Sequence, residues 1–271
     1  RLVTAFLLAV PSVAALQGGG WVAMLGSAAA TAIGALVGAA LTRMGWSSER
    51  TLERPREAAI FMCATVIMGS SVTALVDSAF QSVLNNATWF GFRCTWTLNA
   101  LGAALAVPLV HSLRWPPLPV SRTLASLRPV TWVQTAEMLG VMGSLVITAV
   151  VVFAAPPEAV GPVTLYTYLT TPFLLWAALR FGVRGISVCC LIVAVIALYA
   201  TARGLGPHSA IDRAPELALL HLAQYLLVIT LMTLTATTFI IDRERALAEV
   251  TQWRDRFEGA IHAAGELFYN Y

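Results

Sequence analysis

The segment Leu217 to Ile241, LALLHLAQYLLVITLMTLTATTFII, decides the fold of this chain. It has 25 residues and no formal charge. A helix of about 20 apolar residues is long enough to cross the roughly 30 Å hydrocarbon core of a bilayer. The sequence DRER (Asp242–Arg245) follows without Gly or Pro. Helical spacing then continues, at intervals of 3, 4, 3 and 4 residues, through Leu247, Val250, Arg254, Phe257 and Ile261. The pattern predicts a single helix that crosses a membrane and continues into water.

The composition places the whole chain in a membrane. Hydrophobic residues make up 58% and charged residues 11% of the 271 residues, and the mean hydropathy is +0.75. Charged residues reach about 25% in soluble globular domains. Several windows of 18 or more apolar residues occur, and no persistent alternation suggests a β-barrel. We therefore expect an all-α, polytopic helical membrane bundle. The net charge of +3 comes from arginines in short loops, so no nucleic-acid partner is predicted.

About eight transmembrane helices are expected. Two of them carry local signals: Gly34 and Gly38 form a GxxxG pair that lets helices approach closely, and Pro172 predicts a kink. The predicted spans are Leu2–Leu16, Trp21–Leu41, Ala58–Leu84, Phe92–Leu113, Trp132–Ala155, Leu165–Leu179, Ile186–Ala202 and Leu217–Ile241.

Loop charge predicts the orientation of the bundle. The loops after the second, fourth and sixth spans and the segment after the eighth hold most of the arginines. The loops after the first, third and fifth spans hold none, and the loop after the seventh holds two. Because cytoplasmic loops carry an excess of Lys and Arg, the arginine-rich set and the C-terminus are predicted to be cytoplasmic.

Polar and aromatic residues at the outer ends of the spans suggest a ligand pocket. An ionisable group inside a span is costly and is a functional candidate by default. Asp77 and Arg93 are predicted at the same depth, where they could form an ion pair. The other pocket candidates predicted near that depth are Trp96, Asn99, Tyr166, Tyr168, Tyr199, His221 and Gln224. The alternative is structural, because Trp and Tyr favour any membrane interface. His111 and Glu137 are a second possible pair near the inner face, expected to be structural.

Catalytic and metal signatures are not found in the sequence. It contains no HExxH, GxSxG, P-loop, kinase or cyclase motif. Its four cysteines have no CxxC spacing and no nearby His, so we predict neither a zinc site nor a disulfide framework, and expect buried packing thiols. We assign no catalytic residue, metal ligand or cofactor.

One stretch in the middle of the chain resembles a known family. It is WAALRFGVRG (Trp176–Gly185), preceded by PFLL from Pro172 and followed by TARGLGP (Thr201–Pro207). This arrangement resembles the bacterial integral membrane sensory domain called MASE, first type, over about residues 2 to 245. The family usually has further hydrophobic segments upstream, so a truncated N-terminus is expected.

A second stretch supports the same resemblance. WTLNALG (Trp96–Gly102), with Pro108 six residues further on, is similar to a family segment that has Gly and Asp where this chain has Leu98 and Asn99. A role that needs a carboxylate at position 99 is therefore not expected here. The resemblance implies a multi-pass protein of the bacterial inner membrane.

The tail of the chain is similar to the opening of a PAS domain. The resemblance covers Trp253 to Tyr271, and residues 266–271 are expected to begin the first strand. We divide the chain into a membrane sensory domain (1–241), a cytoplasmic linker or signalling helix (242–261) and the start of a PAS-like module (262–271). Proteins that resemble this layout continue into a histidine kinase, a diguanylate cyclase or a phosphodiesterase.

The sequence thus predicts the sensory input domain of a transmembrane receptor. We expect a small-molecule or membrane-borne stimulus, the lipid bilayer as its surroundings, and a homodimer. The predicted signal-relay residues are Arg243, Leu247, Val250 and Phe257. Two other hypotheses remain: a transporter-like module, for which the kinked sixth span could serve, and a membrane anchor or accessory subunit.

Overall fold

A computed structural model describes residues 21–45, 52, 54–83, 88–114, 132–156, 167–211 and 214–269. These residues are almost entirely helical and contain no strand. Helices are the expected form, because a helix satisfies its own backbone hydrogen bonds in lipid. The elements are α2 (Trp21–Gly45), α3 (Pro55–Phe61), η1 (Met62–Gly69), α4 (Ser70–Val83), α5 (Trp89–Arg114), α7 (Trp132–Phe153), η4 (Tyr168–Thr170), α9 (Thr171–Ala202), α10 (Gly206–Ile211) and α11 (Pro215–Tyr269).

The described residues form six helical stretches that are long and apolar enough to cross a membrane. The second predicted span corresponds to α2, and the third corresponds to α3, η1 and α4 together. The fourth, fifth and eighth correspond to α5, α7 and α11. The predicted sixth and seventh spans are two arms of α9. The predicted first span lies outside the described residues. The expected number of eight is therefore not confirmed.

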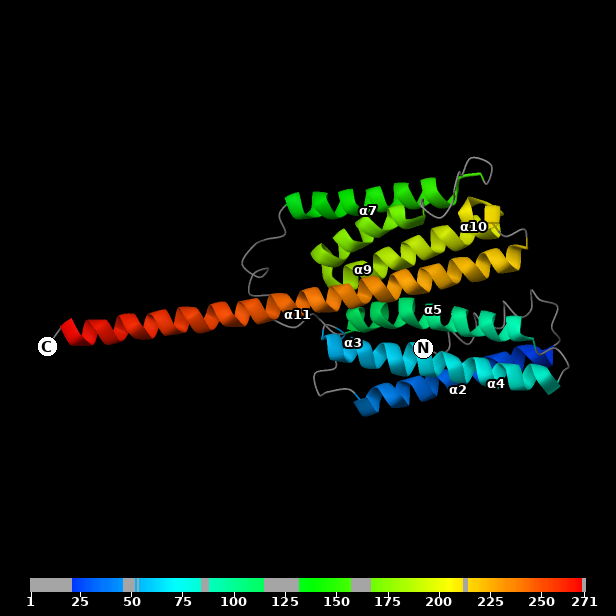
Figure 1. The fold of residues 1–271 in the computed structure, drawn as a ribbon, viewed down its shortest axis with the longest axis horizontal. Helices are drawn as coiled ribbons and strands as arrows, with labels where there is room; N and C mark the ends of the chain where they lie inside the picture. The colour runs from blue at the N-terminus through cyan, green and yellow to red at the C-terminus, as the bar shows by residue number, and fades with distance from the viewer. Residues whose placement is uncertain are drawn as a thin grey trace.

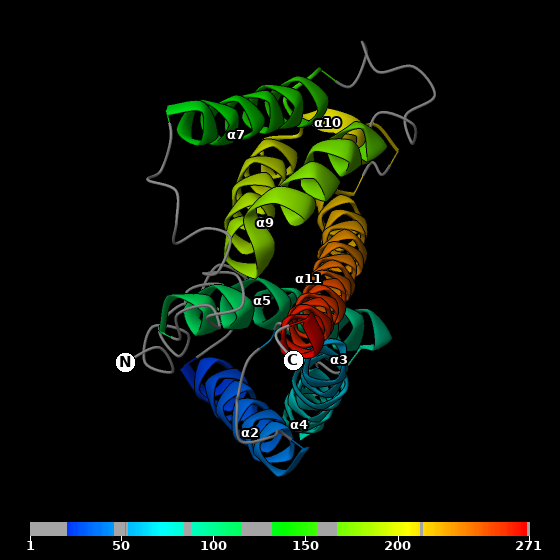
Figure 2. The ribbon, with the colours of Figure 1, turned by 90° about the vertical axis from the view of Figure 1, so that its left-hand side faces the viewer.

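The helices pack on both sides of α11 (Figures 1 and 2). Helices α7 and α9 lie on one side, and α5, α4 and α2 lie on the other. The continuation of α11 projects from one end of the bundle, which we call the linker end. The opposite end, where α4 ends and α5 and α11 begin, is the far end.

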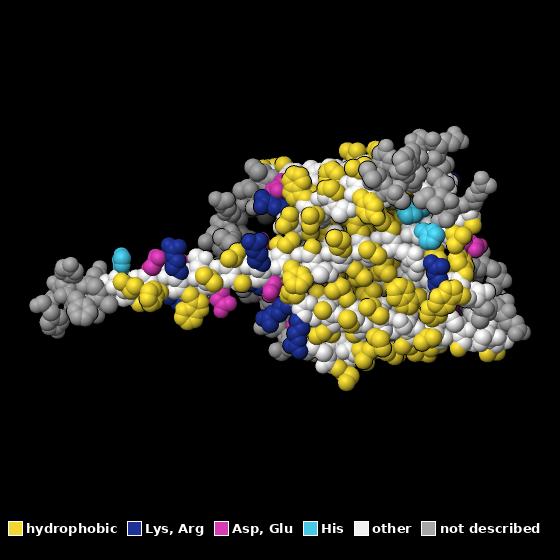
Figure 3. Space-filling view, viewed as in Figure 1, with side chains coloured by type: hydrophobic (Ala, Val, Ile, Leu, Met, Phe, Trp, Pro, Cys, Tyr) yellow, Lys and Arg dark blue, Asp and Glu magenta, His cyan; other side chains and the backbone are white. Residues whose placement is uncertain are grey.

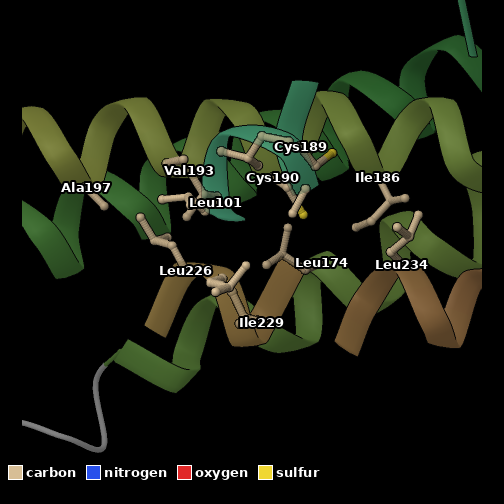
Figure 4. Close-up of a cluster of buried hydrophobic side chains, with 14 of the residues drawn as sticks. Leu101, Leu174, Ile186, Cys189, Cys190, Val193, Ala197, Leu226, Ile229 and Leu234 are labelled. Carbon is tan, nitrogen blue, oxygen red and sulfur yellow. The ribbon is translucent and has the colours of Figure 1, made fainter. Parts of the chain in front are cut away.

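The core of the bundle lies between α5, α9 and α11, with α7 packed against α9. Figure 4 shows Leu101 of α5, both arms of α9 and α11 contributing side chains to it. Leu174, Ile186 and Leu226 are at most 1% exposed. Cys189 and Cys190 are also buried here, which confirms the predicted packing thiols at these two positions, whereas Cys63 is exposed.

The GxxxG pair brings α2 against an unusual part of the third span. Gly34 and Gly38 face η1, an eight-residue π-helix, at Gly69. The Gly69 carbonyl oxygen lies 2.6 Å from the position that a Cβ on Gly34 would take. Thr42 of α2 and Thr65 of η1 are hydrogen-bonded at 2.8 Å. The predicted close approach is confirmed, and small residues make it possible.

Helix α9 reverses direction at Gly182, which has φ 63° and ψ −165° (Figure 1). The rings of Tyr168 and His208, which lie before and after this element, are both about 6 Å from the ring of Tyr225 (5.9 and 6.1 Å between centroids). An unbroken helix would separate two residues 40 positions apart by about 60 Å. The break between the sixth and seventh predicted spans therefore occurs at a glycine, in a region of φ and ψ that is essentially restricted to Gly. The kink predicted at Pro172 is not found there, because Pro172 lies in the first turn of α9, where a proline fits.

Helix α11 is 55 residues long and runs from within the bundle to Tyr269. At 1.5 Å per residue its length is about 80 Å. The predicted continuation past Ile241 is therefore present. The expected strand is not found at residues 266–269, which are helical. A helix bonds its own backbone, whereas a strand needs a partner strand, and the described residues offer none.

Candidate sensory site and the helix that leaves the bundle

Asp77 of α4 is the central polar residue at the far end. Asp77 is buried, with 8% of the residue exposed. Ser27 of α2 donates a hydrogen bond to Oδ1 at 2.5 Å, and Thr95 of α5 donates one to Oδ2 at 3.0 Å. One carboxylate therefore joins three helices. The described residues show no ion pair between Asp77 and Arg93, which sequence analysis had placed within reach of each other.

Two other predicted residues lie on α5, within four positions of Thr95 in the sequence. The indole N–H of Trp96 donates to the hydroxyl of Ser71 at 3.1 Å, which ties α5 to α4 a second time. The amide of Asn99 donates to the backbone carbonyl of Thr95 within its own helix at 2.8 Å. Asp77 and Trp96 thus fasten α4 and α5 to each other. We call these two residues, with Asn99, Ser27 and Thr95, the far-end polar cluster.

A second group of polar residues surrounds Tyr225 of α11, which sequence analysis did not select. The Tyr225 hydroxyl donates to the Thr167 carbonyl at 2.5 Å and lies 3.3 Å from the Thr170 hydroxyl. The rings of Tyr168 and His208 flank it. Tyr225 lies one helical turn after His221 and next to Gln224, so its position within an otherwise apolar run was the available signal.

Of the predicted pocket residues, three belong to the far-end polar cluster. Tyr168 belongs to the Tyr225 group, while His221 and Gln224 are half-buried on the same helix. Tyr199 is 63% exposed and its hydroxyl accepts hydrogen bonds from Arg203. Tyr166 lies outside the described residues. The two groups are connected through the packing of α5 against α11.

The linker end carries a layer of charged side chains, visible in Figure 3 where α11 leaves the bundle. Arg180, in the first arm of α9, forms an ion pair with Glu137 of α7 at 2.8 Å. Arg184, just after the reversal, donates to the Ser112 carbonyl of α5. The expected pair of Glu137 with His111 is wrong, because the reversal of α9 brings Arg180 to this carboxylate.

The projecting part of α11 exposes an apolar stripe. Leu247, Val250 and Phe257 are 56%, 65% and 68% exposed, and Figure 3 shows hydrophobic side chains along this part. Trp253 and Ile261 are exposed as well. Arg254 forms an ion pair with Glu258 one turn later, at 2.8 Å. Among the predicted relay residues, Arg243 lies directly after the membrane-spanning part and is exposed.

These features define a polytopic helical membrane protein whose last helix extends beyond the bundle. The MASE1 family model matches residues 1–245. The chain therefore belongs to the MASE1 family, a family of membrane-integral sensory domains. No curated protein and no solved structure matches it.

The structure explains the stretches that suggested this family. In the WAALRFGVRG stretch, Gly182 supplies the reversal of α9. In the TARGLGP stretch, Gly204 and Gly206 both have positive φ, and the N–H of Gly206 donates to the Ala155 carbonyl at 2.9 Å. This turn therefore fastens the end of α9 to the end of α7. The first stretch thus shapes the reversal within α9, and the second shapes the turn that follows α9. The described residues contain no cluster of three metal-ligating side chains.

Proposed function

We propose that this chain is the input domain of a bacterial transmembrane receptor, and that α11 carries a stimulus to a soluble module that follows it. The observation that supports the proposal is the continuity of α11 from Pro215 to Tyr269. Within the bundle this helix packs against α9, α5, α3 and α10. Beyond the bundle the same helix projects without a break. A shift of α11 inside the membrane would therefore displace its far part.

The same proposal assigns the linker end to the cytoplasm of a bacterial inner membrane. Arg43, Arg56, Arg180, Arg184 and Arg243 belong to segments that end, begin or turn at this end. Arginine-rich segments stay on the cytoplasmic side during insertion. The soluble module would then be a PAS domain, followed by a histidine kinase or an enzyme of cyclic-di-GMP metabolism.

The orientation predicts which side of the membrane labels a new cysteine. In a chain without native cysteines, Gln252→Cys on the projecting helix should react with a membrane-impermeant maleimide only after the cells are permeabilised. Thr88→Cys at the far end should react in intact cells. Both positions are exposed, so reactivity reports the side and not burial. The reverse pattern would contradict the assignment.

We further propose that the receptor is a homodimer that pairs through the apolar stripe of α11. Leu247, Val250, Phe257 and Ile261 have the spacing of a coiled-coil seam and are exposed in the single chain. Two copies with the same orientation in one membrane can pair only in parallel. Arg254 occupies a seam position, and a charged residue there fixes the register of the pair at a cost in stability.

A flexible joint at the membrane exit tests transmission through α11. The double variant Arg243→Gly/Glu244→Gly should abolish the dependence of output on stimulus, because each Gly costs a helix about 1 kcal/mol relative to Ala. The matched control is Arg243→Ala/Glu244→Ala, which removes the same side chains and keeps the helix. The measurement is kinase or cyclase activity of the full-length receptor. Stimulus-dependent output in the Gly-Gly variant would overturn the proposal.

The transporter-like alternative makes a different prediction. Substrate flux in proteoliposomes would distinguish this alternative. The anchor hypothesis would be supported if an unrelated membrane anchor in place of the bundle preserved regulation.

A further inference from the structure

Asp77 lies at membrane depth in the far-end polar cluster. Ser27 and Thr95 each lie six residues after the first residue of their helices, and Asp77 lies six residues before the last residue of α4. Six helical residues correspond to about 9 Å. Figure 1 shows α2, α4 and α5 side by side at this end. The carboxylate therefore lies about two turns below the helix ends, within a span that is otherwise without an acidic residue between Ser70 and Val83.

The hydrogen bonds of Asp77 suit its ionised form. An ionised carboxylate only accepts, and here each oxygen accepts one hydroxyl, at 2.5 and 3.0 Å. Two neutral hydroxyls reduce the cost of burying the charge but do not neutralise it, and an uncompensated buried charge is expensive. The described residues place no Arg or His in an ion pair with Asp77. Binding of a proton would remove the charge.

We propose that Asp77 is a proton-binding site, and that its protonation loosens the contacts of α4 with α2 and α5. The reaction is the transfer of one proton from water at the far end to a carboxylate oxygen, which gives a neutral carboxylic acid. That acid is itself a donor at one oxygen, so the hydroxyl of Ser27 or Thr95 bonded there must turn away or accept. The change therefore acts on the only hydrogen bonds that the carboxylate has in the described part of the chain.

The role of the proton as a stimulus rests on the proposed function, because α11 must carry the change in helix packing to an output. Thr95 belongs to α5, which packs against α11 inside the bundle. A release of α5 from α4 would alter the surface against which α11 rests. The step from proton to helix packing concerns Asp77, Ser27 and Thr95 alone, whereas the step to output concerns α11.

Other charged and titratable groups lie near the far end. Helix α5 contributes Arg93 and Cys94, close to Thr95. Helix α11 contributes Glu216 and His221 in its first turns. Helix α2 has only Arg43, at the opposite end of the bundle, and α4 has no second ionisable group.

Infrared difference spectroscopy of the purified chain in nanodiscs tests the site without any output domain. On acidification, we expect the carbonyl stretching band of a protonated carboxylic acid to appear. The band should disappear in Asp77→Asn. It should persist in Glu137→Gln, a matched control at the linker end whose carboxylate pairs with Arg180. A band of unchanged size in Asp77→Asn would overturn the proposal. A band that changes with sodium concentration at constant pH, and does not change with pH, would also overturn it.

The hydroxyl donors provide a second test that keeps Asp77 in place. Thr95→Val removes a hydrogen bond that favours the ionised form, so the pH of half-protonation should rise by about one unit, a tenfold gain in proton affinity. Thr95→Ser retains the donor and should titrate like the parent. An unshifted midpoint in Thr95→Val would contradict the assignment even if Asp77→Asn did not fold.

Output of the full-length receptor separates this inference from the proposed function. If both hold, output changes with external pH, and Asp77→Asn fixes it at the acidic level. Proton binding in the spectra without any change of output would overturn only the role of α11. Stimulus-dependent output that ignores both pH and Asp77→Asn would overturn only the proton site.

Discussion

Replacement of Gly34 by Ala is expected to lower the free energy of unfolding by about 2–3 kcal/mol, a roughly 30- to 150-fold loss in the folding equilibrium. The new Cβ would lie 2.6 Å from the Gly69 carbonyl oxygen, and it would also collide with the side chain of Thr73. Backbone atoms of two packed helices cannot give way as a flexible side chain can. Helix α2 must therefore move away from η1 and α4.

The matched control for this variant is Gly143→Ala. Gly143 is a helical glycine of α7, and no atom lies within 4 Å of the position that its Cβ would take. There the substitution should be neutral or stabilising by up to about 1 kcal/mol, since Ala is the better helix former. Unfolding in mixed micelles by titration with a denaturing detergent measures both. Equal stability of the two variants would contradict the tight contact.

Replacement of Gly182 by Ala is expected to cost about 1–3 kcal/mol for a different reason. The nearest atom to a new Cβ is the Ile241 Cδ1 at 3.9 Å, so space is available. The cost comes from φ 63° and ψ −165°, which a residue with a Cβ rarely adopts. Relief of this strain would require the two arms of α9 to separate.

Spin labels measure that separation directly. Leu175 in the first arm and Val195 in the second are 44% and 59% exposed, so labels at these positions should disturb the bundle little. Gly182→Ala should broaden or lengthen the distance distribution between them. Gly140→Ala in α7, another helical position with open space around it, should leave the distribution unchanged. A narrow, unaltered distribution in Gly182→Ala would show that the reversal does not depend on this glycine.

Much of the fold could be predicted because lipid imposes simple requirements on the sequence. Long uncharged segments such as Leu217–Ile241 must be helices, because a helix is the one conformation in which a single segment forms all its backbone hydrogen bonds within a bilayer. The absence of Gly and Pro directly after Ile241 predicted the continuation of α11, and α11 does continue. The GxxxG pair of α2 predicted a close contact, which lies at Gly69.

The partners of the polar residues could not be predicted in the same way. Helical spacing gives the depth of Asp77 but not which neighbouring helix faces it. Arg93 was therefore predicted as a possible partner of Asp77, whereas Ser27 and Thr95 form the hydrogen bonds to its carboxylate. The expected pair of His111 and Glu137 failed for the same reason, since only the reversal of α9 brings Arg180 near. Tyr225 was missed because its role depends on Thr167 and His208, which the chain brings back from distant positions.

The sequence by itself determined that this protein lies in a lipid bilayer, that it is helical, that its last helix is long, and to which family it belongs. These properties depend on the hydrophobicity and spacing of neighbouring residues, which are local quantities. Only the tertiary structure decided that α9 folds back at Gly182, that Tyr168 contacts Tyr225, and that one carboxylate joins α2, α4 and α5. Those outcomes depend on rotation of each helix about its axis and on which helices are neighbours. In a uniformly apolar span, the sequence pattern specifies neither the rotation of the helix nor its neighbours. Side-chain packing and paired polar groups decide both.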